Sequence, residues 1–432
     1  MPKKKDKSKI ILQTPKGMHD ILPEDFVFYK AIYDKAEEIS NYYGFMPIKT
    51  PHLERLELFN AGLGDTSDII EKQMYTLKTQ GGDKLALRPE GTAPIMRSYI
   101  EHGMQTWPQP VMFQYQGSFF RHEKPQKGRL RELQQFGLEI IGEEKPVAEA
   151  MTIRVLTLIL EELGLKSIVV HINSLGDKEC RNNYRKELLG FYKKRLGQLC
   201  RDCKNRYSKN PLRILDCKEE KCIEIKAEAP QMINYLCTPC KQHLKEVLEF
   251  LDSNNISYFL DTHLVRGLDY YSRTVFEFFE EKSEEENETP IALGAGGRYD
   301  YLAHALSNKN FPAIGGALGI DRIVQTMKDR SIPVRHSKPS KIFFIQLGTA
   351  AKYKSLKIIE TLRKAHVPVI QSISKDTLKS QLRIASKLNM SYALILGQRE
   401  ALEDSIIIKD MDTSTQETVP IEKIVEFIKK KL

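Results

Sequence analysis

The chain has 432 residues, a formal net charge of +9 and a hydrophobic share of 41%. That share supports buried cores and excludes a disordered protein, and the length favours roughly three domains. No window approaches the ~20 apolar residues of a membrane helix, and the N-terminal residues lack a signal-peptide apolar region. Seven cysteines in a chain of this length do not form a secreted disulfide scaffold. We therefore predict a multi-domain cytoplasmic protein without a membrane partner.

The charge is divided unevenly along the chain. Residues 1–9 carry +4, residues 176–240 carry +6 and residues 341–432 carry +6, whereas residues 10–175 carry −4 and residues 241–340 carry −3. Such asymmetry favours a polyanionic partner that is bound at the periphery of the protein. Solvated lysines on helix surfaces are the alternative, and charge alone does not decide between the two.

The first elements alternate helices with short strands. Apolar residues at helical spacing predict a helix over residues 23–43, and the prolines at 47 and 51 fit an extended edge strand. Strand patterns follow at residues 84–87, 111–119 and 133–141, before a long helix at residues 148–163. Runs of strands between helices favour an α+β domain built on an antiparallel sheet.

Residues 176–250 differ in composition from both flanks. They are rich in Lys and Arg, largely helical in period, and contain the clustered cysteines. We interpret them as a helical insertion into a larger domain that spans residues 10–330. Strand patterns resume at residues 257–260 and 274–279, and the charged run 280–288 is predicted to be a solvated hairpin loop. Residues 1–9 are predicted to form a basic disordered tail.

A linker rich in Pro and Ser at residues 331–340 precedes a smaller C-terminal domain, residues 341–432. Strand patterns at residues 341–347, 367–371, 392–396 and 405–409 alternate with helical patterns at residues 353–365, 375–388 and 420–430. This alternation predicts an α/β domain with a wound sheet. The domain lacks a Gly-rich phosphate loop, which indicates a binding module and not an ATPase.

Two polar clusters follow predicted strands in the domain of residues 10–330. Glu90 and Thr92 come directly after the strand at 84–87, where a helix-capping role is the plain alternative. The second cluster is a hairpin loop with cations at positions 121, 124, 127, 129 and 131. The returning strand carries Gln135 and Glu139 on one face, because strand side chains alternate. Arginines at the base of such a loop match phosphate oxygens bidentately, whereas a solvated hairpin would not explain the two polar strand residues.

The third cluster combines the run LVRGLDYY at residues 264–271, AGGRYD at 295–300 and GGALGIDR at 315–322. Its glycines allow a ligand to approach the backbone closely. Arg322 lies at the start of a predicted helix, where positive potential favours a phosphate group.

With these residues in view, the chain resembles the histidyl-tRNA synthetase family of class II aminoacyl-tRNA synthetases over nearly its whole length. FRHEKPQKGRLRELQQFGLE resembles motif 2 and GALGIDR resembles motif 3. The helix before Pro51 resembles motif 1, which forms the dimer interface in this family. LVRGLDYY is similar to the family's histidine-binding signature, which makes it the most specific of these matches.

The resemblance implies a role for each matching residue. Arg121 would contact the α-phosphate of ATP, Arg322 the γ-phosphate, and Arg266 the α-phosphate from the other side, where related enzymes place a metal. Further ATP contacts would be Glu123 and Arg129. The histidine pocket would consist of Glu90, Thr92, Gln135, Glu139, Tyr270 and Tyr271. The tRNA acceptor end would meet Gln126 and Arg131.

The resemblance also implies the reaction and the partners. The enzyme would join L-histidine and ATP to histidyl-adenylate and pyrophosphate, and would then transfer histidine to the 3′ end of tRNA(His). ATP would carry Mg²⁺, held largely by substrate oxygens. A homodimer and a C-terminal anticodon-binding domain would complete the molecule. The main alternative is the synthetase-like, histidine-sensing regulatory subunit of ATP phosphoribosyltransferase, and a further alternative is an RNA-binding module.

Two positions depart from the family pattern. Asp321 stands where a Glu is common, and Tyr301 follows the AGGRYD run where a Gly is usual. Neither departure removes one of the implied substrate contacts.

Six of the seven cysteines lie in the insertion, in the spacings Cys200-x2-Cys203, Cys217-x4-Cys222 and Cys237-x2-Cys240. Paired C-x2-C motifs are typical of a tetrahedral zinc site. A structural zinc would take Cys200, Cys203, Cys237 and Cys240, with Cys180 excluded. Buried, incidental thiols remain the alternative, and the family resemblance does not require the metal.

Overall fold

The computed structural model describes residues 12–63, 69–126, 128–281, 291–334 and 341–431. The chain divides into two compact units, Met1–Val334 and Arg335–Leu432. The predicted tail 1–9, most of the predicted loop 280–288 and most of the predicted linker 331–340 lie outside the described residues. In the described part of the chain, no helix is long and apolar enough to cross a membrane.

The first unit is built on an eight-stranded sheet that is antiparallel except for one parallel pair at each edge. This arrangement confirms the predicted antiparallel α+β domain. The strands predicted at 111–119 and 133–141 form a long antiparallel hairpin at residues 111–141. In sheet order, the strands are β1 (Met46–Pro47), β5 (Val111–Phe120), β6 (Glu132–Ile141), β11 (Ala313–Gly319), β10 (Gly294–Arg298), β9 (Ser272–Glu280), β7 (Ile168–Ser174) and β8 (Tyr258–Leu260).

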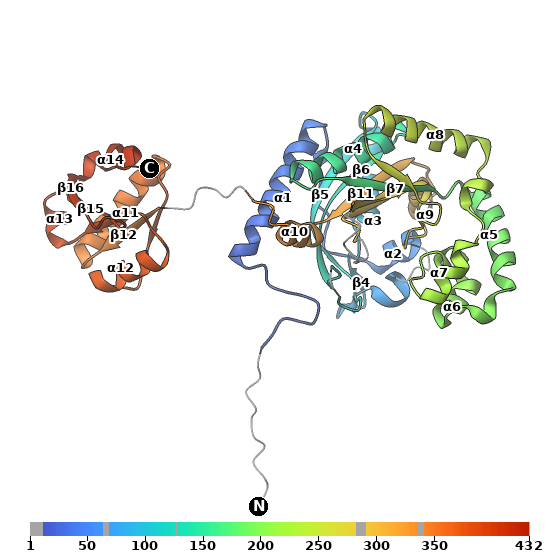
Figure 1. Ribbon diagram of the computed structural model, residues 1–432, viewed down its shortest axis with the longest axis horizontal. Coiled ribbons are helices and arrows are strands. Elements are labelled where there is room, and N and C mark those ends of the chain that lie inside the picture. The colour runs from blue at the N-terminus through green and yellow to red at the C-terminus, as the bar shows by residue number, and fades with distance from the viewer. Residues whose placement is uncertain (1–11, 64–68, 127, 282–290, 335–340, 432) are drawn as a thin grey trace, which may run out of the picture. The chain divides into compact units, whose positions relative to one another are not determined.

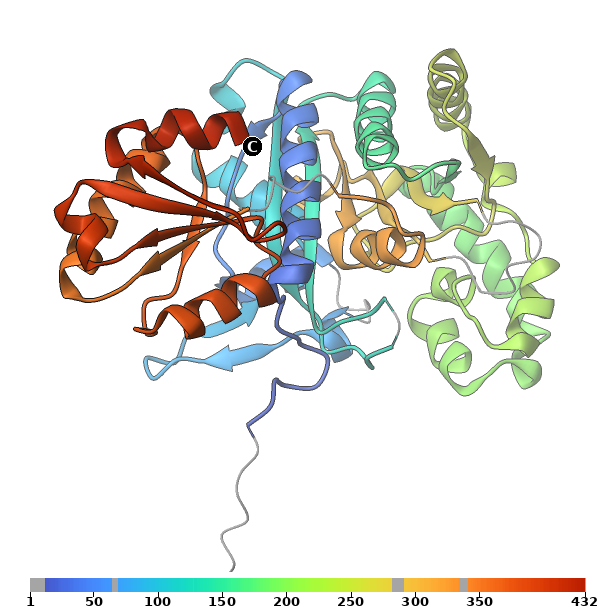
Figure 2. The same cartoon turned by 60° about the vertical axis from the view of Figure 1, so that its left-hand side comes forward.

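Four helices cover one face of this sheet, and Figure 2 shows the first of them running along β5. Their apolar residues pack on the strand side chains that point toward them, including Phe136, Leu138 and Ile140 of β6. Because strand side chains alternate, Gln135 and Glu139 are directed to the opposite face, as predicted. The four helices are α1 (Pro23–Tyr42), α4 (Val147–Glu162), α8 (Thr238–Ser253) and α10 (Ile320–Asp329).

Shorter elements pack against part of the opposite face and form a second core there with Tyr115, Tyr271 and Tyr299. A three-stranded sheet in the order β2-β4-β3 lies in the same region of the chain. The remainder of this face stays open as a cavity. The elements are α2 (Leu56–Leu63), α3 (Thr92–Glu101), α9 (Leu302–Ser307), β2 (Leu53–Arg55), β3 (Thr76–Lys78) and β4 (Lys84–Leu87).

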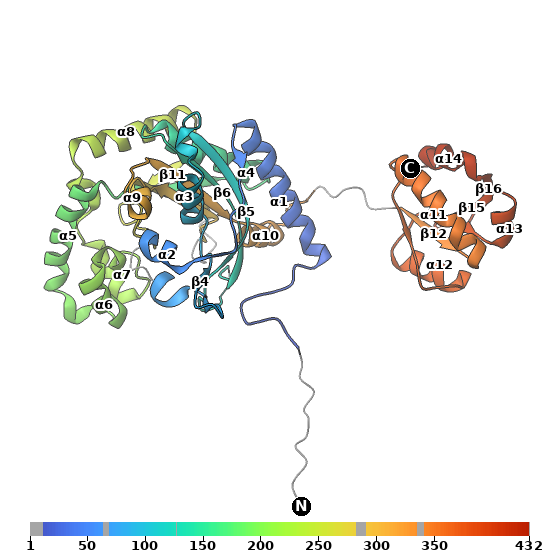
Figure 3. The ribbon, with the colours of Figure 1, turned by 180° about the vertical axis from the view of Figure 1, so that it is seen from behind.

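Residues 176–250 are helical and contain a core of their own, with Tyr184, Leu188 and Leu244 among its buried residues. Figures 1 and 3 show their helices gathered at the end of the sheet away from α1. The last helix, α8, continues to Ser253, and its Val247 and Leu251 pack into the core beneath the sheet. The other helices are α5 (Lys178–Lys193), α6 (Arg201–Lys209) and α7 (Glu220–Ala227).

The second unit contains a five-stranded mixed sheet, which agrees with the predicted α/β class. The predicted strands and helices are present, but β16 and α13 were not predicted. The strand β16 is an exposed edge strand with polar residues, so it lacks the alternating pattern that marks a half-buried strand. Its elements are β12 (Ile342–Gln346), α11 (Thr349–Lys364), β13 (Val369–Gln371), α12 (Leu378–Lys387), β14 (Tyr392–Leu396), α13 (Gln398–Leu402), β15 (Ser405–Asp410), β16 (Gln416–Pro420) and α14 (Ile424–Lys431).

Candidate active site

A cavity of about 1350 Å³ opens on the face of the large sheet that the four helices leave uncovered. One wall comes from the β5–β6 hairpin and the start of α3, and another comes from residues 200–226 of the insertion. The cavity brings together most of the predicted site, although its members come from segments far apart in the sequence. The predicted residues in its lining are Glu90, Thr92, Arg121, Glu123, Gln126, Arg129, Gln135, Arg266, Tyr270, Tyr271 and Arg322.

Glu90 lies at the N-terminus of α3 and is buried. Its carboxylate accepts hydrogen bonds from the backbone N–H groups of Thr92, at 2.7 Å, and Ala93, at 3.0 Å, so it does cap the helix. The hydroxyl of Tyr270 donates to the same carboxylate at 3.3 Å. Burial raises the pKa of Glu90, against the opposing effect of these hydrogen bonds. The capping and pocket interpretations are therefore compatible at this residue.

Glu139 is fully buried and lies beneath the pocket, outside the cavity lining. Thr92 Oγ1 donates to its Oε1 at 2.7 Å, and the hydroxyl of Tyr299 donates to Oε2. Burial raises the pKa of Glu139 to about 8, and the nearby Glu90 adds to this effect. A Cβ atom at position 315 would lie 1.6 Å from Glu139 Oε2, so only glycine leaves room for the carboxyl group.

The sequence analysis did not assign Tyr115 or Tyr299 to the site. Tyr115 of β5 lines the cavity, and Tyr299 contacts the Tyr270 ring at a centroid distance of 5.8 Å. Tyr299 lies within the AGGRYD run, in which only the glycines were interpreted as part of a binding site. The alternation of β5 places Tyr115 on the same side as Phe113, so the strand pattern alone could have predicted which face of the sheet Tyr115 occupies.

Three guanidinium groups, those of Arg121, Arg129 and Arg322, converge in the cavity. Arg121 Nε donates to the carbonyl of Pro89 at 2.8 Å, and Arg322 donates to the carbonyls of Gly128, at 2.8 Å, and Ala292, at 2.7 Å. Burial lowers the pKa of Arg322, and the nearby charges of Arg129 and Arg121 lower it further. Cations held this close by backbone carbonyls favour a polyanion between them.

Arg266 forms an ion pair with Glu277 of β9, and both side chains are largely buried. Its guanidinium lies 5.8 Å from the centroid of the Tyr271 ring. Burial lowers the pKa of Arg266, but Glu277, the two neighbouring tyrosines and Asp216 of the insertion together raise it above its ordinary value. Glu277 was not predicted as a site residue, since nothing in the run around it marks a polar site.

Besides Glu139, two further predicted contacts, Arg131 and Pro51, lie outside the cavity lining. Arg131 donates to the carbonyls of Glu123, at 3.2 Å, and Lys16, at 3.3 Å, and so ties the N-terminal segment to the hairpin. Pro51 is exposed and lies between β1 and β2.

The two departures from the family pattern have structural partners. Asp321 accepts hydrogen bonds from the hydroxyl of Tyr29 and the backbone N–H of Gln134, both at 2.7 Å. It therefore joins α1 to β6 beside the cavity. The ring of Tyr301 contacts the ammonium group of Lys178, at 4.5 Å from its centroid, and this links α9 to the insertion.

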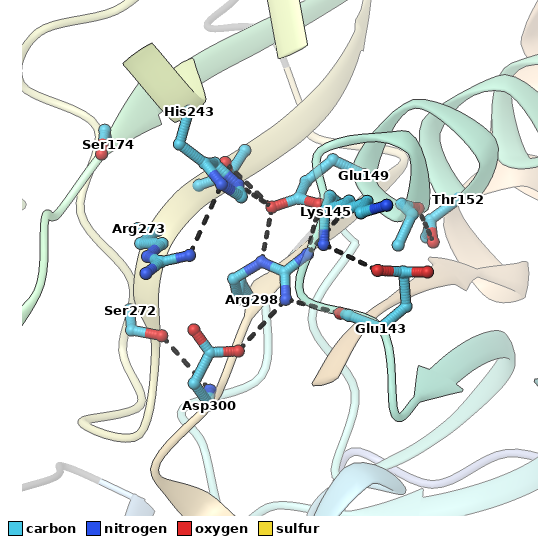
Figure 4. A network of polar contacts seen from close by, with 12 residues as sticks. Glu143, Lys145, Glu149, Thr152, Ser174, His243, Ser272, Arg273, Arg298 and Asp300 are labelled. Atoms are coloured by element: carbon cyan, nitrogen blue, oxygen red, sulfur yellow. Dashed lines mark hydrogen bonds and ion pairs between the residues drawn. The ribbon is translucent and has the colours of Figure 1, made fainter. Parts of the chain in front are cut away.

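A buried ion pair supports the strand that carries Tyr299. Arg298 donates to Glu149 of α4 through two nitrogens, at 2.6 and 2.5 Å, and neither side chain is exposed (Figure 4). His243 of α8 lies 2.6 Å from the same carboxylate. Burial raises the pKa of Glu149, but Arg298 and His243 outweigh it and hold the pKa at about 2. This network was missed because its three members come from distant segments.

The predicted zinc ligand set is wrong, because the structure separates its members. Cys200 and Cys203 lie with Cys217 and Cys222, whereas Cys237 lies in a second group. That second group consists of Asp177, Cys180, Cys237 and Cys240. Cys180, which was not expected to take part, is therefore one of its members.

The antiparallel sheet contains the β5–β6 hairpin, α1 packs on one face of it, and arginines converge on a polar pocket at the other face. This combination defines a class II aminoacyl-tRNA synthetase. The family model described as histidyl-tRNA synthetase matches residues 17–323, and the model described as anticodon binding domain matches residues 341–431. The chain belongs to the histidyl-tRNA synthetase family.

Individual relatives agree with this assignment. The chain is similar to the histidine--tRNA ligases of Natranaerobius thermophilus (38% identity, covering 97% of this chain and 99% of the relative) and Dehalococcoides mccartyi (40%, 97% and 100%). Among solved structures, the apo histidyl-tRNA synthetase of S. aureus matches with a TM-score of 0.79 and 30% identity, over 97% of this chain and 100% of that one. The predicted family, fold class and enzyme class are confirmed.

Proposed function

We propose that this chain attaches L-histidine to tRNA(His) in two steps. In the first step, a carboxylate oxygen of histidine attacks the α-phosphorus of ATP, and pyrophosphate leaves. In the second step, a terminal hydroxyl of the tRNA attacks the carbonyl carbon of the adenylate, and AMP leaves. The observation that carries this proposal is the single cavity in which Glu90 and Tyr270 lie together with Arg121, Arg266 and Arg322.

The small polar pocket suits histidine. An imidazole presents two polar nitrogens, and the carboxylate of Glu90, the hydroxyl of Thr92 and the hydroxyls of Tyr270 and Tyr271 offer partners for them. A pocket with buried polar groups rejects an apolar isostere by as much as ~10⁴-fold, because those groups would be left unpaired. Gln135 completes this wall. Glu139 acts from beneath the pocket, by orienting Thr92 and Tyr299.

The first step needs no nucleophile from the protein, since the histidine carboxylate attacks. The protein contributes position and positive charge. Arg121 and Arg266 would contact the α-phosphate, and Arg322 the γ-phosphate. Arg129 and Glu123, whose side chains lie 3.5 Å apart, would flank the nucleotide. Mg²⁺ would arrive with ATP as part of the substrate. The Zn²⁺ predicted for the insertion would have a structural role, because thiols take no part in this reaction.

The remaining partners follow from the family. Residues 341–432 would bind the anticodon, and Gln126 in the cavity would meet the acceptor end of tRNA(His). Arg131 would act there through its hold on the motif 2 hairpin. We propose a homodimer that uses the region before Pro51, where Phe26 and Tyr42 of α1 are exposed apolar residues. A cytoplasmic location accompanies a role in protein synthesis.

The regulatory-subunit alternative is not favoured, because the curated relatives are histidine--tRNA ligases over their full length. One solved structure, titled ATP phosphoribosyltransferase regulatory subunit/histidyl-tRNA synthetase from Bacillus halodurans C, matches with a TM-score of 0.63 and 22% identity. At that identity the match shows the shared fold alone.

Histidine-dependent exchange of pyrophosphate into ATP tests the proposal directly. We expect exchange with histidine and none above background with the other amino acids, followed by histidine-specific charging of tRNA(His). A chain that binds histidine but gives no exchange would be the regulatory type. Exchange that does not depend on histidine would overturn the assignment.

A further inference from the structure

The insertion holds two separate groups of metal-ligand atoms. The tetrathiol cluster consists of Cys200, Cys203, Cys217 and Cys222, and the aspartate cluster consists of Asp177, Cys180, Cys237 and Cys240. In each cluster, the ligand atoms of the four residues all lie within 4.8 Å of one another. Neither cluster contains a residue that the proposed aminoacylation chemistry uses.

The tetrathiol cluster has the dimensions of a zinc centre. A tetrahedral Zn²⁺ with Zn–S bonds of about 2.3 Å places its sulfurs about 3.8 Å apart. Cys200 Sγ lies 3.9 Å from Cys217 Sγ, whereas a disulfide requires about 2.05 Å. Cys203 and Cys222 are fully buried, and the cluster offers four sulfurs for the four positions of a tetrahedral ion, as structural zinc sites do.

Backbone amides already point at these sulfurs. Cys200 caps the N-terminus of α6, and its Sγ accepts from the backbone N–H of Cys203 at 3.4 Å. The N–H of Cys200 donates to Cys222 Sγ at 3.3 Å. These donors stabilise sulfur in its anionic form, which is the form that binds a metal. The four ligands come from the start of α6, the turn before α7 and α7 itself, so a metal would join three segments.

The aspartate cluster differs in one decisive respect. Asp177 accepts hydrogen bonds from the thiols of Cys237, at 3.4 Å, and Cys240, at 3.5 Å, so two thiol protons have an oxygen acceptor. Across the described residues, the hydrogen bonds of the tetrathiol cluster run only between sulfurs and from backbone amides. Four thiols packed together without an oxygen acceptor, three of them buried, are best satisfied by a shared cation.

We propose that the tetrathiol cluster binds one structural Zn²⁺. Binding deprotonates the four thiols and releases their protons to solvent, which leaves a tetrathiolate centre. The centre lies directly behind the wall of the active-site cavity, because Cys200, Cys217 and their neighbours Arg201 and Asp216 line that cavity. The metal therefore holds Arg201 and Asp216 in place in the cavity wall, where Asp216 acts on Arg266. This structural role is separate from the aminoacylation chemistry.

Metal analysis of the purified full-length chain tests this site. We expect one equivalent of zinc per chain to be lost in Cys217→Ser/Cys222→Ser and retained in the matched control Cys237→Ser/Cys240→Ser, which alters the aspartate cluster. Two equivalents in the parent chain, with one lost in each double variant, would support the site and add a second. Unchanged zinc content in Cys217→Ser/Cys222→Ser, or no zinc after refolding with ZnCl₂, would overturn the proposal.

A second measurement covers a variant that fails to fold. With the unmodified chain, thiol titration should find the four tetrathiol cysteines protected until a chelator is added, and Co²⁺ exchanged into the protein should give the visible bands of tetrahedral cobalt–thiolate coordination. Rapid modification of all seven cysteines without chelator, or disulfide-linked peptides from residues 200–222, would contradict the proposal. Neither measurement depends on aminoacylation activity, so the two proposals fail separately.

Discussion

Glu139 shows at the scale of one residue how burial changes the charge of a group. Its carboxyl group is enclosed by Thr92, Tyr299 and the bare backbone of Gly315, and this burial raises its pKa to about 8. The folded protein therefore keeps a proton that the unfolded chain releases near its ordinary value of 4.5. A neutral Glu139 beside a second buried carboxyl, that of Glu90, avoids placing two negative charges together.

This proton predicts a pH dependence of stability. The stabilising contribution of neutral Glu139 is full below about pH 4.5 and is lost as the pH rises through about 8. Glu139→Gln stays neutral, so between about pH 5 and pH 8.5 the unfolding free energy of the parent chain should fall relative to this variant. The fall should be a few kcal/mol, since one pKa unit corresponds to about 1.4 kcal/mol. Urea unfolding at both pH values measures it.

The exposed residue Glu24 supplies the control for this measurement. Glu24→Gln should follow the parent chain at both pH values. If Glu139→Gln followed the parent chain equally well, Glu139 would be charged in the folded protein and its assigned position beneath the pocket would be wrong.

Arg266 is the residue whose loss should most affect the first step. Arg266→Ala removes a cation from the site of developing phosphate charge, so we expect pyrophosphate exchange to fall by about 10²–10³-fold in kcat. Arg266→Lys should restore only part of it, because an ammonium cannot replace the planar guanidinium fork. Arg330→Ala breaks another Arg–Glu ion pair, with Glu280, outside the cavity lining and should leave exchange unchanged. Equal activity in Arg266→Ala would remove Arg266 from the proposed mechanism.

At the scale of elements, the end of β10 depends on a contact with the helix layer. Arg298, the last residue of β10, pairs with Glu149 of α4, and the next residue, Tyr299, reaches the pocket and donates to Glu139. The pair lies on the side of the sheet away from the substrate, yet it fixes the turn that orients the pocket. Because the pKa of Glu149 is lowered to about 2, its contribution to stability is present above about pH 4.5 and lost as the pH falls toward 2.

Breaking this pair should cost more than any exposed pair. Glu149→Ala removes the fully buried ion-pair partner of Arg298 and leaves, among the described residues, only Asp300 in that role, so we expect a loss of about 3–5 kcal/mol in unfolding free energy. The KM for histidine should rise as Tyr299 loses its position. Asp34→Asn, which breaks the exposed Lys30–Asp34 pair on α1, should change stability by less than about 1 kcal/mol. Urea unfolding together with exchange kinetics checks both effects, and equal losses in the two variants would contradict the role given to Glu149.

At the scale of the whole molecule, the net charge of +9 is distributed unevenly between the basic segments and the acidic remainder of the chain. The basic segments, residues 176–240 and 341–432, are the insertion and the unit that matches an anticodon-binding domain. The acidic remainder contains the catalytic sheet, with Arg121, Arg266 and Arg322 in the cavity lining. A polyanion bound by the basic parts releases counterions, whereas histidine activation does not.

This division predicts two different salt responses. Raising the salt from about 50 to 200 mM should weaken tRNA(His) binding by about 10³-fold if the chain makes six or more phosphate contacts. Histidine-dependent exchange in the absence of tRNA should change by less than about twofold, because its charges are held inside the cavity. Filter binding and exchange assays in the same buffers measure both. A parallel decline of the two activities would contradict the assignment of the basic segments to tRNA.

The sequence by itself determined the elements with a strong period and the motifs with short spacing. The helix at residues 23–43, the hairpin of residues 111–141 and the shared face of Gln135 and Glu139 all follow from local patterns that the structure reproduces. The family followed from runs such as LVRGLDYY, because the eight adjacent residues of that run carry the match. These features depend on neighbours in the chain, and such neighbours are visible without the fold.

The tertiary structure alone decided what depends on distant segments meeting. The glycine-rich strands β10 and β11 have little strand propensity of their own. They pair as strands between β6 and β9, and their close packing requires glycine, because a Cβ at Gly296 or Gly315 would collide with the sheet backbone or with Glu139. The grouping of the cysteines was equally beyond spacing rules, since C-x2-C pairs do not say which other pair they meet. Contacts between residues more than a hundred positions apart, such as Glu149 and Arg298, form only when the chain packs. Local sequence patterns therefore cannot predict them.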